Sequence, residues 1–128
     1  MRLVFWWAIS VLFLLAIAPR TIQAQDYPTR TITLVVPYAA GGGNDAMARI
    51  VADKMSKSLG QQIVIENRGG AGGTIATRAV AKAAPDGYTL IIGGTGTLAV
   101  NPTLYANVGY DPRKDFAPVG LIATSALV

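Results

Sequence analysis

The alternation of apolar and polar positions predicts a strand followed by an amphipathic helix. The apolar run at residues 32–36 is typical of a buried strand, and Pro37 ends it because proline has no N–H for a sheet ladder. A helix is expected from about Asp45 to Leu59, with Asn44 as its cap and Gly60 just beyond its end. Its expected apolar face consists of Met47, Ile50, Val51, Met55 and Leu59.

The same pattern repeats after Gly60. A β-branched strand is expected at residues 62–66, a second helix at about 74–84, and a third strand at 89–93. The turn signal Pro85-Asp86-Gly87 separates the last two. The packing face expected for the second helix consists of Ile75, Ala76, Ala79, Val80 and Ala83.

Strands and helices that alternate with short loops predict an α/β fold with a parallel βαβαβ sheet and right-handed crossovers. Ligands of such sheets bind beyond the carboxyl ends of the strands. Three loops rich in glycine or small polar residues are expected there, at residues 38–44, 67–73 and 94–100. Topology alone therefore predicts that the three loops converge on one site.

The first loop has the features of an anion site. Three consecutive glycines allow backbone amides to approach a ligand closely, and a helix N-terminus that favours negative charge follows them. A tight turn without a ligand is the alternative. The charge of Asp45 either complements the helix N-terminus or orients ligand-bound water. The candidate ligand-binding residues of this loop are Tyr38, Ala39, Ala40, Gly41, Gly42, Gly43, Asn44 and Asp45.

The other two loops add polar candidates. Arg68 is the one residue of these loops with a cationic side chain that donates strongly to anions. It either contacts a ligand or pairs with Glu66 or Asp45. Thr95 and Thr97 are expected to direct hydroxyl groups into the cleft. Gly69 and Asn101 complete the set of candidate ligand-binding residues.

Two further patterns favour structural roles. Residues 94–99 match G-x-G-x-x-A, but they follow the third predicted strand rather than the first, which argues against a dinucleotide site. Asp111 and Asp115 could be paired carboxylates for acid–base catalysis, yet Arg113 and Lys114 between them favour a salt-bridged surface loop. Asn101-Pro102 suits a loop or the start of a short helix, and residues 117–128 are expected to form a strand that joins the sheet.

Composition narrows the function classes. Residues 1–24 resemble a cleavable secretory signal, with Arg2 before an apolar run and cleavage expected after Ala24. Without Arg2 and Arg20, nine basic residues remain against seven acidic ones, which is no argument for a nucleic-acid partner. The chain has no cysteine or histidine, so disulfides, the usual zinc sites and Ser-His-Asp catalysis cannot be built from it. We expect no catalytic residue, metal or cofactor.

Five stretches together resemble the Bug family, the TctC-like extracytoplasmic solute receptors of tripartite tricarboxylate transporters. The first is the segment 27–45, which contains Val35-Val36-Pro37-Tyr38-Ala39-Ala40-Gly41-Gly42-Gly43-Asn44-Asp45. The others are residues 64–73, 85–90, 101–105 and 110–116. Asn44 stands where the family often has threonine or serine, and Gly69 and Gly109 replace common prolines.

The resemblance implies a type II periplasmic-binding-protein fold, in which two lobes close on a ligand as a Venus flytrap does. Residues 25–128 would be an incomplete first lobe, and the second lobe would be absent. The implied function is capture of a small carboxylate in the periplasm and its delivery to membrane permease subunits, by a receptor expected to be a monomer. A periplasmic α/β enzyme or a ligand sensor that uses the same glycine-loop anion site is the alternative.

Overall fold

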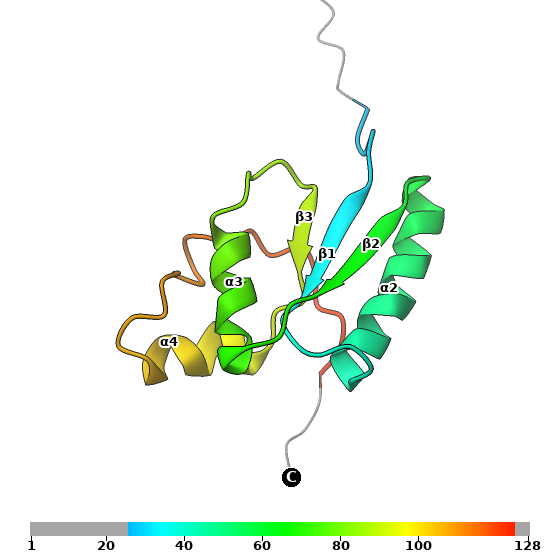
Figure 1. Cartoon of the computed structure of the whole chain (residues 1–128). Helices are drawn as coiled ribbons and strands as arrows, with labels where there is room; N and C mark the ends of the chain where they lie inside the picture. The colour runs from blue at the N-terminus through cyan, green and yellow to red at the C-terminus, as the bar shows by residue number, and fades with distance from the viewer. Residues whose placement is uncertain (1–25, 125–128) are drawn as a thin grey trace, which may run out of the picture.

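In the computed structural model, which describes residues 26–124, a small parallel sheet lies between two helices (Figure 1). Strands β1 (Ile32–Val36), β2 (Ile63–Asn67) and β3 (Thr89–Ile91) are arranged in the order β2-β1-β3, and both neighbours pair with β1 in parallel. This arrangement confirms the predicted βαβαβ sheet. Strand β1 is central and almost completely buried, so the loop that follows it is anchored in the core.

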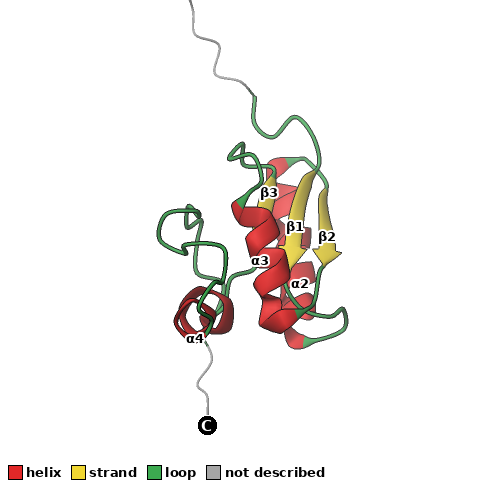
Figure 2. Cartoon of the chain, turned by 60° about the vertical axis from the view of Figure 1, so that its left-hand side comes forward, coloured by secondary structure: helices red, strands yellow, loops and turns green. Residues whose placement is uncertain are grey.

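Helix α2 (Gly43–Leu59) covers one face of the sheet, and helix α3 (Thr74–Ala81) covers the other (Figure 2). Alternate residues of β1 divide between the two faces. Ile32, Leu34 and Val36 pack with Ala48 and Ala52 of α2, while Thr33 and Val35 face α3. The core cluster consists of Ile32, Leu34, Val36, Ala48, Ala52, Ile63 and Ile92, with Tyr38, Met55, Leu59, Ile65, Tyr88 and Leu90 packed against it.

The helices differ from their predictions in their ends and buried faces. Helix α2 begins at Gly43 with Gly42 as its cap, and no side chain caps it, so the prediction of Asn44 as the cap is wrong. Gly60 ends the helix in the left-handed conformation as predicted, and its N–H donates to the Ser56 carbonyl. Ile50 and Ile75, which were predicted to pack, are 66% and 58% exposed, whereas the smaller Ala48, Ala52 and Ala76 are the buried residues of these helices' apolar faces.

The third loop is helical rather than irregular. After β3 the chain forms a turn of π-helix, η2 (Gly96–Val100), which runs directly into the short helix α4 (Asn101–Leu104). Pro102 lies in the first turn of α4, where the fixed φ of proline is compatible with a helix. A 3-10 turn, η1 (Ala71–Gly73), similarly precedes α3. The prediction of a loop at 94–100 is therefore wrong, whereas a short helix from Asn101 is confirmed.

The segment at 117–124 forms no strand, in contrast to its prediction. Its apolar side chains lie in solvent, with Val119 and Leu121 each 82% exposed. A strand needs a neighbour with free backbone groups, and this segment pairs with no strand among residues 26–124. The remainder of the predicted strand, residues 125–128, lies outside the described residues, as does the predicted signal at 1–24.

Candidate ligand site at the carboxyl ends of the strands

The three loops meet at one point beyond the sheet. Gly73 of the second loop has a φ of +88°, and a Cβ atom on it would lie 2.7 Å from Thr97 Cγ2 of the third loop. The same atom would lie 3.2 Å from Pro37 Cβ of the first loop. Only glycine combines this backbone conformation with so close an approach. The predicted convergence of the loops is therefore confirmed.

The carboxylate of Asp45 joins the first two loops. Its Oδ2 accepts hydrogen bonds from the Gly41 N–H at 2.9 Å and from Arg49 Nε at 3.0 Å, and its Oδ1 accepts from Asn67 Nδ2 at 3.0 Å. The residue is only 3% exposed. These donors, the Arg49 guanidinium first among them, lower the pKa of Asp45 to about 2, so it is charged at any physiological pH.

Asn67 adds a second link between the same loops. Its Nδ2 also lies 3.4 Å from the Tyr38 carbonyl oxygen, and the backbone N–H of the next residue, Arg68, donates to the Val36 carbonyl. Asn67 ends β2 directly opposite Val36 in the parallel register. The strand pairing therefore carries the amide side chain to the glycine loop.

Buried polar groups fasten the third loop to the second. Asn101 Nδ2 donates to the Gly72 carbonyl and to Thr74 Oγ1, each at 3.0 Å. Thr97 is fully buried, and its hydroxyl bonds to the backbone of Gly94 instead of facing a cleft. The prediction that this hydroxyl points into the cleft is wrong, because the helical turn folds it back on its own loop.

Most of the remaining candidate ligand-binding residues are accessible to solvent. Tyr38 is half-buried, whereas Ala39, Ala40, Gly41, Gly42, Gly43, Asn44, Gly69 and Thr95 are exposed. Within residues 26–124, the N–H groups of Gly43, Asn44 and Asp45 find no acceptor, because the first helical bond is from Ala46 to Gly42. The N–H of Gly41, in contrast, is taken by Asp45. Ligand contact by all these residues stays a prediction.

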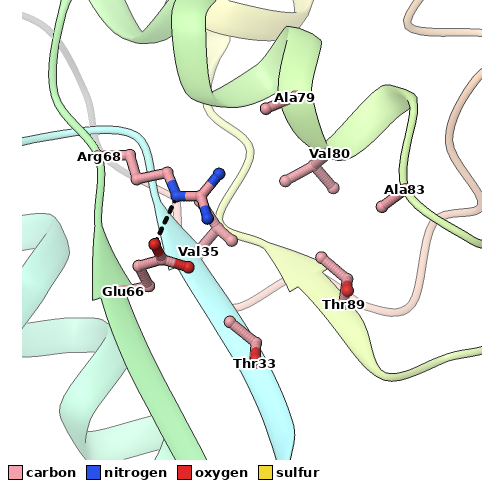
Figure 3. Close-up of a pocket in the computed structure, with 8 residues that line it drawn as sticks. All are labelled: Thr33, Val35, Glu66, Arg68, Ala79, Val80, Ala83 and Thr89. Carbon is pink, nitrogen blue, oxygen red and sulfur yellow. Dashed lines mark hydrogen bonds and ion pairs between the residues drawn. The ribbon is translucent and has the colours of Figure 1, made fainter.

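Arg68 forms an ion pair with Glu66 at the mouth of a small cavity (Figure 3). Arg68 Nε donates to Glu66 Oε1 at 2.6 Å, and this bond raises the pKa of Arg68. Of the two carboxylates considered as partners, Glu66 is thus the observed one, and Asp45 pairs with Arg49 instead. The cavity of about 220 Å³ lies between the sheet and α3, with Thr33, Val35, Thr89, Ala79, Val80 and Ala83 as its other lining residues.

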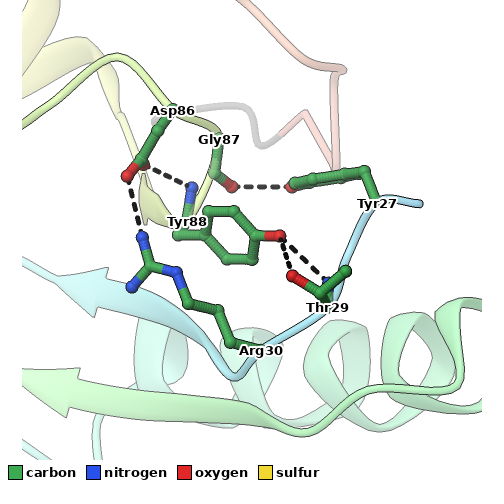
Figure 4. Close-up of polar contacts among 6 residues, drawn as sticks. All are labelled: Tyr27, Thr29, Arg30, Asp86, Gly87 and Tyr88. Carbon is green, nitrogen blue, oxygen red and sulfur yellow. Dashed lines mark hydrogen bonds and ion pairs between the residues drawn. The ribbon is translucent and has the colours of Figure 1, made fainter. Parts of the chain in front are cut away.

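A second polar cluster fastens the opposite end of the sheet (Figure 4). Tyr27 Oη donates to the Gly87 carbonyl at 2.7 Å, and the Thr29 N–H donates to Tyr88 Oη at 3.0 Å. Arg30 pairs with Asp86 at 2.8 Å and lies 4.0 Å over the Tyr88 ring. These contacts, which we call the N-terminal clasp, tie the segment before β1 to the turn before β3, far from the glycine loops.

Residues 26–124 show few features of a metal site, a pair of catalytic carboxylates or a membrane span. No group of three or more carboxylates, histidines or cysteines among residues 26–124 could hold a metal ion. Asp111 accepts from the Arg113 N–H and Asp115 from the Asp111 N–H, so both carboxylates serve their own surface loop. No helix within this part of the chain has the length and apolarity needed to cross a membrane.

Two residues of the loop network were missed by sequence reasoning. Arg49 follows Asp45 by four residues, and the i,i+4 rule for helices could have identified the pair. Asn67 carries no such local signal, because its contact with Asp45 spans 22 residues. Only the register of β1 and β2 brings the two side chains together.

Comparison with known proteins gives a consistent result. The family model described as "Tripartite tricarboxylate transporter family receptor" matches residues 47–128. A UPF0065 protein of Agrobacterium vitis is 51% identical over 115 residues, which are 89% of this chain and 33% of that protein. Protein BugT of Bordetella pertussis is 43% identical over 108 residues, or 84% of this chain and 33% of BugT. The chain thus spans about a third of the length of these curated relatives.

Solved structures of periplasmic binding proteins share the fold. MatC from Rhodopseudomonas palustris with bound malate matches with 52% identity and a TM-score of 0.72, over 75% of this chain and 33% of MatC. The binding protein BugD matches with 49% identity and a TM-score of 0.71, over 73% of this chain and 31% of BugD. An R. palustris protein with adipate matches with 49% identity and a TM-score of 0.65, over 68% of this chain and 29% of that protein.

Proposed function

The chain belongs to the tripartite tricarboxylate transporter receptor family, and from this premise we propose that it contributes a carboxylate-binding loop to a periplasmic solute receptor. The observation that carries the proposal is the set of N–H groups at the start of α2, on Gly43, Asn44 and Asp45, which have no acceptor within residues 26–124. They lie beside an exposed glycine loop at the edge where the three loops meet.

This arrangement suits a carboxylate for electrostatic reasons. The helix dipole places partial positive charge at the first turn of α2, and several N–H donors can share one anionic group. The nearby charged side chains are already paired, Asp45 with Arg49 and Arg68 with Glu66. A ligand would therefore be held by backbone groups and bridging water rather than by a fixed cation.

The ligand class follows from the neighbours. MatC is described with malate, and the R. palustris neighbour with adipate, and both are small dicarboxylates. We extend that class to this chain, with Tyr38 to Asn44, Gly69 and Thr95 as the contacting residues of the first lobe. In this proposal residues 25–128 are part of the first lobe, and a second lobe closes on the ligand. The receptor is secreted through a signal cleaved after Ala24 and delivers its ligand, as a monomer, to membrane permease subunits.

Ligand-dependent thermal stabilisation of the full-length receptor tests the proposal. Malate, adipate and citrate would each be added over a range of concentrations, with the uncharged dimethyl esters of malate and adipate as matched controls. A ligand at one hundred times its Kd stabilises the folded state by about 2.7 kcal/mol, which raises the melting temperature by a few degrees. We expect at least one acid, and neither ester, to give this rise. No rise across a broad carboxylate panel would contradict the proposal.

A further inference from the structure

The tip of the glycine loop is held by a hydrogen bond rather than by packing. A Cβ atom on Gly41 or on Gly43 would meet no atom within 4 Å, so this part of the loop projects into open space. Gly41 also has a φ of +84°, a conformation that glycine adopts without strain and shares with several alternatives. The bond from its N–H to Asp45 Oδ2 at 2.9 Å is the restraint that the structure provides there.

The carboxylate that accepts this bond is engaged by three protein donors. Both of its oxygens accept, from Gly41, Arg49 and Asn67, and the residue is 3% exposed. Its charge is balanced by Arg49, whose side chain extends toward solvent and is 59% exposed. Of the roughly four acceptor sites of an ionised carboxylate, three are thus occupied by donors of the protein itself.

We propose that Asp45 is a positioning residue, which fixes the Gly41 loop against the end of β2 before a ligand arrives. The inference rests on the proposed function, because it concerns the same carboxylate site. Through Asn67, which also contacts the Tyr38 carbonyl, the carboxylate connects the loop after β1 with the strand beside it. The donors of the first turn of α2 are thereby held in one arrangement, and the loss of entropy on binding is reduced.

The binding test compares two carboxylates of the same helix. Asp45→Ala removes the acceptor of the Gly41 bond, and Asp53→Ala removes an exposed carboxylate that pairs with Lys57 with the same i,i+4 spacing. Affinity for malate and adipate would be measured by calorimetry on the full-length receptor. We expect Asp45→Ala to weaken binding at least tenfold and Asp53→Ala to change it less than twofold.

The direction of the effect distinguishes positioning from direct contact. Removing a negative charge beside an anion site would by itself strengthen the binding of a dicarboxylate. A positioning residue gives the opposite result, and the loss is the same for malate and adipate because Asp45 touches neither. Unchanged or tighter binding by Asp45→Ala would overturn the proposal.

Amide hydrogen exchange of the ligand-free receptor provides a second readout, which does not depend on the proposed function. We expect the Gly41 amide to exchange at least tenfold faster in Asp45→Ala than in the wild type or Asp53→Ala. The Ile32 and Thr33 amides, which bond across the sheet, should stay protected and report an intact fold. Equally fast exchange at Gly41 in all three proteins would refute the positioning role. If the wild type binds no carboxylate, only the proposed function fails.

Discussion

At the scale of single residues, Gly73 is tightly constrained. It has a positive φ, and it lies against Thr97 and Pro37 of the two neighbouring loops. A side chain there would incur two separate costs, one from the left-handed backbone and one from the collision. The contact of the three loops therefore depends on the absence of one methyl group.

We predict that Gly73→Ala destabilises the fold by roughly 2–5 kcal/mol, which combines about 1–2 kcal/mol for the backbone with about 1–3 kcal/mol for overpacking. Gly41→Ala is the matched control, because its φ of +84° is nearly the same but its Cβ would meet nothing. Urea denaturation of both variants measures the difference. Equal losses of stability would mean that Thr97 and Pro37 move aside at little cost.

Sequence reasoning identified the position of Asp45 but not the partners that its carboxylate has. Asn67 reaches it through the pairing of Val36 with Asn67, a relation between distant residues that no local pattern contains. Arg68 shows the same limit. Both alternatives for it were physically sound, and the short bond to the adjacent Glu66 favours pairing because it needs little loss of side-chain entropy. Local chemistry thus predicts candidates, while the register of the strands selects their contacts.

At the scale of elements, strong local signals predicted the strands well. Strand β1 was predicted with the bounds it has, because an apolar run ends at a proline that cannot donate to the ladder. The start of α2 and the third loop were less predictable. Glycine at the cap needs no side-chain bond, so the helix begins earlier than Asn44 indicated, and Pro102 is accommodated in the first turn of α4.

The first turn of α2 allows a donor to be removed without breaking the helix. Gly43→Pro deletes the N–H of the first helical residue, and the preceding Gly42, with a φ of −81° and a ψ of 172°, already has the extended backbone that a proline requires. We predict that this variant binds its carboxylate about tenfold or more weakly, since a charge-assisted hydrogen bond contributes roughly 1.5–3 kcal/mol.

Gly43→Ala is the control for this prediction, because it keeps the N–H and its Cβ would meet no atom within 4 Å. Its affinity, measured by the same titration calorimetry, should be clearly higher than that of Gly43→Pro, because the donor is retained. Circular dichroism of both variants would establish that α2 is intact. Wild-type affinity in Gly43→Pro would show that this amide makes no contact with the ligand.

At the scale of the whole molecule, topology was the most predictable property. The alternation of strands and helices was sufficient to predict a parallel sheet with its loops at one edge, and the family resemblance is confirmed by the related receptors. The segment at 117–124 was not predictable in the same way. Its composition is that of a strand, but strand formation requires a neighbour, and composition does not specify one.

We predict that the amides of residues 117–124 exchange in this 128-residue chain at close to the rate of an unfolded peptide. They donate to no acceptor within residues 26–124, whereas the Ile32 and Thr33 amides bond across the sheet and should be protected. Hydrogen–deuterium exchange followed by NMR or mass spectrometry measures both sets in one experiment. Protection of 117–124 at the level of β1 would mean that this segment does pair as a strand.

The position of the N-terminal clasp has a practical consequence for binding measurements on immobilised protein. It lies before β1, while the glycine loop follows the same strand, and five residues of strand separate the two by about 17 Å. An affinity tag or biosensor tether attached ahead of Asp26 would therefore lie at the end of the sheet opposite the glycine loop. Immobilisation through this end should leave the glycine loop open to solution and unhindered by the chip.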